Sequence, residues 1–170
     1  MPRLHWFIRL ICSLLFGALA LSAGAEDLTE LDRNPTMRQN ELWINVGAHS
    51  EHFGKKEGAR DFNEDNLGLG FEYRTSNTYT YTLGYYNNSL DHPTHYAGVF
   101  YQPLQWGYAR FGAVVGLMDG YPDMNNGNYF LAAMPAVSVE YKQVGVNLLF
   151  IPPLPQIVSA VAIQFKFKLN

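Results

Sequence analysis

The most constraining feature of this sequence is a series of segments, each about ten residues long, in which apolar and polar residues alternate from Leu42 onward. Alternation with a period of two places the apolar side chains on one face of a β-strand. About ten residues is also the length that a tilted strand needs to cross a bilayer. The alternation predicts strands at 42–53, 65–75, 78–88, 95–103, 108–118, 130–142, 144–151 and 158–169.

The connections between these segments alternate in length. Longer connections are predicted at 54–64, 87–94, 119–129 and 152–157, and shorter ones at 76–77, 104–107 and 142–143. Outer-membrane barrels have short periplasmic turns and longer extracellular loops, with both termini in the periplasm. The sequence therefore predicts an all-β fold over 42–170, an eight-stranded antiparallel up-and-down transmembrane β-barrel in the outer membrane of a Gram-negative bacterium.

The first 25 residues have the features of a signal peptide. Arg3 and Arg9 give the positive end, the apolar run covers 10–21, and the small residues 23–25 form a cleavage site. The apolar run is shorter than the roughly 20 residues of a membrane-spanning helix. Cys12 lies inside this segment, so no disulfide is expected. Residues 26–41 are polar and are predicted to form a periplasmic N-terminal tail.

Composition excludes some partners. Loss of Arg3 and Arg9 leaves 10 basic residues against 15 acidic ones, a net charge of −5, which excludes nucleic acid as a partner. Aromatic residues make up 15% of the chain and charged residues 16%, a balance typical of a lipid-facing surface. We expect a monomer without cofactor. We also expect no metal, because a site at His92 and His95 would need further ligands arranged around them, and turn formation explains the acidic and amide residues of 119–126.

The alternation also sorts the inward-facing residues by depth. Those near the periplasmic end are charged or polar, namely Glu72, Arg74, Arg110, Ser138, Glu140, Gln164, Lys166 and Lys168. Those near the outer end are small or apolar, namely Gly68, Gly70, Gly84, Val114, Gly116, Ala132, Met134, Ala160 and Ala162. The charged set can pair and close one end. The small set indicates a pocket for an acyl chain, or else glycines that only ease strand bending and packing.

Three groups of residues resemble the lipid A palmitoyltransferase family. The first is Pro135–Pro152, with Ser138, Tyr141, Val144, Phe150 and Ile151. The second is Asn63-Glu64 followed by Gly68, Gly70 and Phe71, and the third runs from Ser89 through Ala97-Gly98 to Pro103-Leu104. The resemblance implies an eight-stranded barrel that holds a phospholipid acyl chain in its outer half and transfers it to lipid A.

The resemblance also implies where the catalytic residues lie. The family's Asp-Ser pair after the third strand falls on Asn88 and Ser89, and its histidine at the end of the first strand falls on His52 or His49. Strict alternation turns His49 inward, whereas His52 lies nearer the loop. Two departures stand out, because Asn88 replaces the aspartate and the predicted tail lacks the family's amphipathic helix.

Two functions follow from these residues. In the first, a histidine accepts a proton and Ser89 acts as nucleophile or orients the ester, so that an acyl chain on lipid A or lipopolysaccharide is transferred or hydrolysed. The partners are then a phospholipid acyl chain and lipopolysaccharide, whose phosphates Lys55, Lys56 and Arg60 can contact. In the second, the chain is a non-catalytic structural or lipid-binding barrel.

Overall fold

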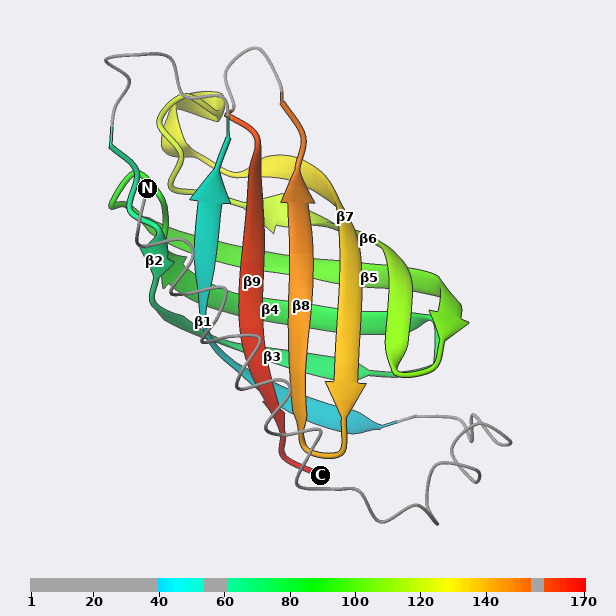
Figure 1. Ribbon diagram of the computed structural model, residues 1–170. Coiled ribbons are helices and arrows are strands. Elements are labelled where there is room, and N and C mark those ends of the chain that lie inside the picture. Colours follow the sequence, from blue (N-terminus) through cyan, green and yellow to red (C-terminus); the bar gives the residue numbers. More distant parts are fainter. Residues whose placement is uncertain (1–39, 54–60, 154–157) are drawn as a thin grey trace, which may run out of the picture. The chain divides into compact units, whose positions relative to one another are not determined.

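The computed structural model describes residues 40–53, 61–153 and 158–170. The predicted signal peptide, most of the predicted tail and the basic residues Lys55, Lys56 and Arg60 lie outside these residues. One antiparallel sheet accounts for all the strands of the described part (Figure 1). Its strands are β1 (Glu41–His52), β2 (Asp65–Asn66), β3 (Gly68–Arg74), β4 (Tyr79–Asn87), β5 (Pro93–Trp106), β6 (Ala109–Met118), β7 (Phe130–Tyr141), β8 (Val144–Ile151) and β9 (Ala160–Lys168).

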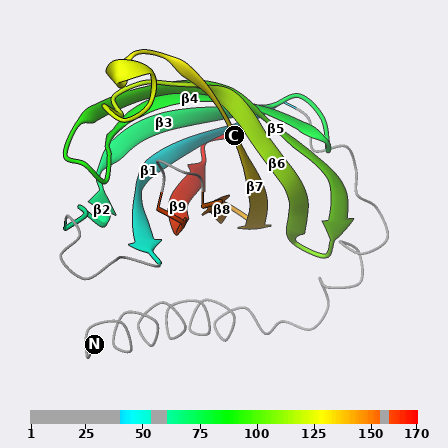
Figure 2. The ribbon, with the colours of Figure 1, turned by 90° about the horizontal axis from the view of Figure 1, so that it is seen from above.

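Each strand from β3 to β8 pairs with the next one along the chain, and β1 pairs with both β3 and β9. The sheet therefore closes, and Figure 2 shows its strands curving around a common interior. This confirms the predicted eight-stranded antiparallel barrel, with the two-residue β2 as an addition on β1. The strand boundaries agree with the prediction to within a few residues. The largest difference is at β5, which continues to Trp106 and leaves only Gly107 and Tyr108 in the turn.

A β-bulge interrupts β1 between Asn45 and Ala48. Gly47 lies in it with φ +87°, a conformation that glycine adopts without steric cost. One extra residue reverses the alternation of the strand. Beyond the bulge, Ser50 pairs with Ala162 and His52 with Ala160, whereas odd-numbered residues pair with the outward-facing part of β9.

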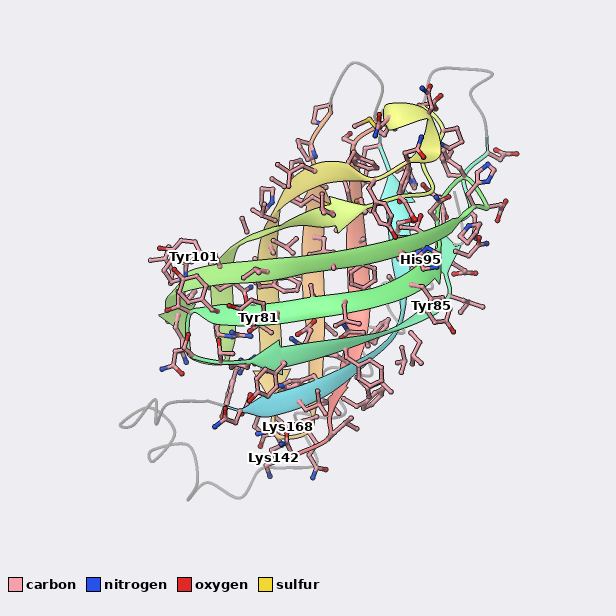
Figure 3. The ribbon with its side chains drawn as sticks, turned by 180° about the vertical axis from the view of Figure 1, so that it is seen from behind. Tyr81, Tyr85, His95, Tyr101, Lys142 and Lys168 are labelled. Carbon is pink, nitrogen blue, oxygen red and sulfur yellow. The ribbon has the colours of Figure 1, made fainter. Side chains whose placement is uncertain are left out.

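The outer face of the barrel carries the large apolar and aromatic side chains. Tyr81, Tyr85 and Tyr101 project from β4 and β5 away from the interior (Figure 3). Other exposed apolar residues include Leu69, Phe71, Leu83, Val115, Leu117, Leu131, Phe150, Phe165 and Phe167. An apolar exterior around a charged interior is the arrangement of a transmembrane barrel. Among the described residues, no helix has the length and apolarity to cross a membrane.

The buried apolar core is small. Phe100, Val114 and Ala136 form it, and Met134 and Leu149 pack against it. Most of the fully buried large side chains are polar or charged. Backbone pairing around the closed sheet and interior polar contacts therefore define this fold more than apolar burial does.

Candidate functional site

Charged side chains fill the end of the barrel that carries the short turns. Glu140 is at its centre and accepts two hydrogen bonds from Arg74, at 2.5 and 2.7 Å, and one from Arg110 at 2.9 Å. The Lys166 ammonium lies 2.6 Å from the same carboxylate and 2.7 Å from Glu72. All five side chains are at most 3% exposed.

This network, which we call the charged floor, extends to Glu41, whose carboxylate pairs with Arg74 at 2.7 Å and with Lys168 at 2.6 Å. The ammonium of Lys166 and the guanidinium of Arg74 also lie over the ring of Trp43. Buried charges are tolerated when each is paired and hydrogen-bonded. The predicted inward-facing charges therefore pair and close this end of the barrel.

Aromatic side chains occupy much of the opposite half. Tyr96 and Tyr86 pack with their rings 5.9 Å apart, the Tyr86 and Tyr121 hydroxyls share a hydrogen bond of 2.9 Å, and Tyr121 packs against Phe130. A Cβ added to Gly84 would lie 2.7 Å from the Tyr96 hydroxyl, and one added to Gly70 would collide with the same group. These two glycines make room for Tyr96.

A small apolar cavity of about 70 Å³ remains beside this aromatic group. Four of the predicted pocket residues line it, namely Val114, Gly116, Ala132 and Met134. The other five, Gly68, Gly70, Gly84, Ala160 and Ala162, lie outside its lining. Sites for small molecules commonly measure about 300–1,000 Å³. The cavity is therefore too small for a complete acyl chain.

The bulge in β1 decides which way the two candidate histidines face. His49 pairs with Ile163 on the outer face, and its Nδ1 lies 3.0 Å from the Asp65 carboxylate. His52 pairs with the inward-facing Ala160 and stacks on Phe62, with ring centroids 4.2 Å apart. Strict alternation predicts that His49 faces inward. This prediction is wrong, because the bulge turns His49 outward and His52 inward.

Asn88, at the start of the connection between β4 and β5, is fully buried. Its amide nitrogen donates to the Thr94 hydroxyl at 2.9 Å and to the Gly120 carbonyl at 2.8 Å. Its amide oxygen accepts from the backbone N–H groups of Leu90 and His92, at 2.8 and 3.1 Å. Both donors and both acceptor positions of the amide are used in holding two connections together.

Ser89 follows in the turn and is half-buried. The backbone N–H of Asn63 donates to the Ser89 carbonyl at 3.0 Å, and Phe62, the preceding residue, stacks on His52. Residues 62–63 thus link the two candidate catalytic residues at the loop end of the barrel. The link runs through a ring stack and a main-chain bond, neither of which transfers a proton between His52 and Ser89.

A second contact, like the bonds of Asn88, ties the region where β5 begins to the connection between β6 and β7. The backbone N–H of His95 donates to Asp119 at 2.6 Å, and the His95 ring lies 3.2 Å from the same carboxylate. Burial alone would raise the pKa of the Asp119 carboxyl, but these hydrogen bonds outweigh it and lower that pKa below its usual value. Burial raises the pKa of the nearby Tyr121 hydroxyl, which stays a neutral hydrogen-bonding group.

We did not predict from the sequence that Tyr86 and Tyr96 pack inside the barrel, because we considered only the small and apolar inward positions in this half. A signal was present in the strand register. Gly70 is paired with Gly84, and Gly84 with Tyr96, so two small residues and one large residue lie at a single level on neighbouring strands. Such an arrangement is typical of interior packing in small barrels.

Comparison with known proteins supports the class of fold. The chain is similar to a de novo designed transmembrane β-barrel, with a TM-score of 0.54 and 12% identity over 78% of this chain and 98% of that one. A weaker similarity is to the N-terminal β-barrel domain of Pseudomonas aeruginosa OprF, with a TM-score of 0.46 and 12% identity over 77% of this chain and 98% of that one. Another is to Ail of Yersinia pestis, with a TM-score of 0.39 and 12% identity over 77% of this chain and 99% of that one.

The chain is thus a small transmembrane β-barrel of the outer-membrane type. Barrels of this kind span the outer membrane of Gram-negative bacteria, and the predicted location follows from the fold. Neither a family model nor a curated protein matches the chain. The resemblance to lipid A palmitoyltransferases therefore stays a prediction.

Proposed function

We propose that this protein is a non-catalytic barrel that acts as a monomer, has a structural role in the outer membrane and binds the surrounding lipid. The observation that carries this proposal is the state of Asn88. It occupies the position where acyl transfer would need a carboxylate, yet its amide is fully buried and holds Thr94, Gly120 and two backbone N–H groups. A group committed to these bonds cannot orient or charge-stabilise a histidine.

The interior supports the same reading. The charged floor fills one half, and the aromatic side chains of Tyr86, Tyr96 and Tyr121 take up much of the other. The cavity of about 70 Å³ admits at most the end of a chain that reaches in from the membrane. Lipid is then bound mainly by the apolar and aromatic exterior.

Acyl transfer or hydrolysis on lipid A is the second candidate, and one observation favours it. His52 has inward parity beyond the bulge, and residues 62–63 connect it to Ser89. In that reaction, the phospholipid ester bond breaks and a new ester forms on a lipid A hydroxyl. The proton of that hydroxyl passes through His52 to the departing lysophospholipid alcohol. Ser89 would act as nucleophile or orient the ester.

The two functions are separated in a strain from which the gene is deleted. The strain receives the wild-type chain, Ser89→Ala or His52→Ala, with each protein matched for amount in the outer membrane. Lipid A is analysed by mass spectrometry, and resistance of the cells to detergent is measured in parallel. We expect identical lipid A masses in all strains and equal restoration of detergent resistance by all three proteins.

A different result would favour catalysis. A lipid A species that changes in mass by one acyl chain with the wild type, and reverts with Ser89→Ala, would overturn the non-catalytic proposal. Detergent resistance that only the wild type restores would do the same, provided that both variants fold. Folding is checked by the shift in gel migration that closed barrels show on heating.

A further inference from the structure

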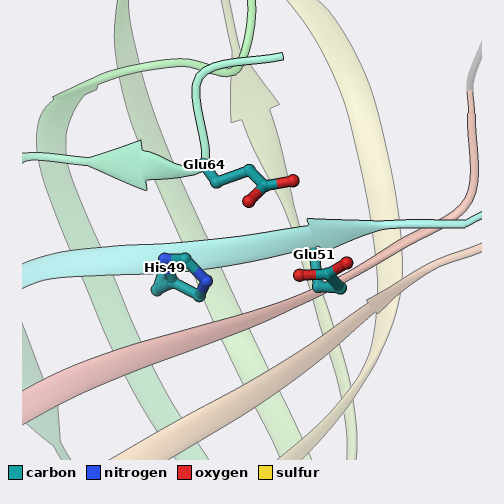
Figure 4. A group of neighbouring side chains, drawn as sticks. All are labelled: His49, Glu51 and Glu64. Atoms are coloured by element: carbon teal, nitrogen blue, oxygen red, sulfur yellow. The ribbon is translucent and has the colours of Figure 1, made fainter. Parts of the chain in front are cut away.

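Three side chains able to ligate a metal ion converge on the outer face of β1 near its carboxyl end. They are His49 and Glu51, both on β1, and Glu64, which precedes β2 (Figure 4). One ligand atom from each lies within 4.8 Å of the others, and all three residues are half-buried. We propose that they bind a divalent transition-metal ion, with Zn²⁺ as the representative ion. We call this group the rim cluster.

Strand pairing fixes the backbone positions of the rim cluster. The bulge at Gly47 turns His49 and Glu51 to the same outward face, where they are neighbours two residues apart. On the other side, His49 is paired with Asp65. The N–H of Ser50, between the two β1 ligands, donates to the Glu64 carbonyl at 2.8 Å. Backbone hydrogen bonds therefore hold the three residues next to one another at this end of β1.

Asp65 supplies an independent feature of a metal site. Its carboxylate lies 3.0 Å from Nδ1 of His49 and is not a member of the rim cluster. Histidines that ligate metals commonly donate their other ring N–H to a carboxylate, which fixes the tautomer and the ring orientation. With Nδ1–H directed at Asp65, the lone pair is on Nε2, the atom that we assign to the metal.

The types of ligand identify the class of ion. An imidazole with two carboxylates suits zinc and other first-row transition metals, whereas Mg²⁺ and Ca²⁺ prefer ligand sets made entirely of oxygen. Zn²⁺ lies about 2.0–2.2 Å from nitrogen and oxygen ligands, so tetrahedral ligands are about 3.4 Å apart. Small rotations of half-buried side chains close the distance from 4.8 Å. Three protein ligands leave a fourth position for water or an anion.

The charge balance among these residues favours the same conclusion. Glu51, Glu64 and Asp65 place three carboxylates around the single imidazole of His49. Like charges this close together repel one another. A divalent cation held by Glu51 and Glu64 would offset the charges of these two carboxylates.

The test uses the chain without an affinity tag, folded in detergent micelles, freed of metal with chelator and titrated with Zn²⁺ by calorimetry. Co²⁺ serves as a second probe, because its visible absorption reports the ligand geometry. We expect one equivalent of Zn²⁺ to bind. His49→Ala and Glu64→Gln should each weaken binding at least about tenfold. Asp65→Asn should weaken it by about 10–100-fold, because the carboxylate that orients the His49 ring is lost.

His95→Ala is the matched control, because His95 also lies beside a carboxylate near the loop end of its strand but outside the rim cluster. It should leave Zn²⁺ affinity unchanged. Absence of Zn²⁺ binding by the wild type would overturn the proposal, as would full affinity in His49→Ala or an equal loss in His95→Ala. Each variant is confirmed as a closed barrel by its heat-dependent gel migration before titration.

Discussion

The hydroxyl of Tyr96 occupies the space that a Cβ of Gly70 would need. The two residues lie on β5 and β3, at one level of the barrel, with Gly84 between them on β4. Replacing Gly70 with alanine therefore introduces a clash in the interior. The glycines at this level match the size of a specific aromatic side chain, which is why they do not enclose a pocket.

Gly70→Ala should lower the free energy of unfolding by about 1–3 kcal/mol, the usual cost of overpacking. Tyr96→Phe in the same chain should recover part of that loss, because phenylalanine lacks the clashing hydroxyl while its ring carbon stays 3.2 Å from the new Cβ. Urea unfolding in lipid vesicles measures both. Strictly additive effects of the two substitutions would show that the residues do not share this space.

Glu140→Gln should destabilise the barrel more than Glu41→Gln. Glu140 faces Arg74, Arg110 and Lys166 and is 1% exposed, so loss of its charge leaves three buried cations without their shared anion. Removing one partner of a buried ion pair costs about 3–5 kcal/mol. Glu41 pairs with only one fully buried cation, Arg74, and with Lys168, which is 26% exposed, and Arg74 keeps its bonds to Glu140 when Glu41 loses its charge. Equal midpoints of urea unfolding for the two variants would contradict this ranking.

Asn88→Asp would supply the aspartate that the resemblance to lipid A palmitoyltransferases implies at this position, yet it should only weaken the protein. The substitution removes the two donated hydrogen bonds, to Thr94 and Gly120, at a buried position. Unsatisfied buried groups cost about 1–3 kcal/mol. The control is Asn128→Asp, which loses one exposed hydrogen bond to Asn125 and should change stability little. Thermal unfolding compares them, and a gain of lipid A acylation by Asn88→Asp would refute the structural role.

The contact between Asp119 and His95 should weaken in acid. The pKa of the Asp119 carboxyl is lowered in the folded protein from its usual 3.8, so the contact stabilises the loops fully above that value. The stabilisation is lost as the pH falls through the lower folded-state pKa. The chemical shift of the His95 backbone amide, which donates to this carboxylate, follows the transition by NMR. Asp119→Asn should abolish the pH dependence, and a shift that persists in that variant would implicate another group.

Period-two alternation was sufficient to predict most of the barrel. It placed Glu72, Arg74 and Glu140 inside and Phe71 and Phe165 outside. This succeeded because these strands are regular and the bilayer requires apolar side chains on the outer face of the barrel. It failed on β1 beyond Gly47, since a bulge leaves no mark in a pattern of apolar residues. The facing of His49 and His52 could therefore not be predicted.

Other features of the candidate site depend on contacts between distant strands. The match of Tyr96 with Gly70 and Gly84 requires the register of three strands. The rim cluster joins two residues of β1 to one that follows an intervening connection, so no sequence spacing indicates a metal site. The burial of Asn88 likewise depends on Gly120, 32 residues away.

The charged floor bears on the transport of solutes through the barrel. A barrel with ion pairs packed across one end is a cup and not a tube, because buried charged side chains occupy that end. With the short turns in the periplasm, as the sequence predicts, a search for partners should begin with the cell surface and the outer leaflet.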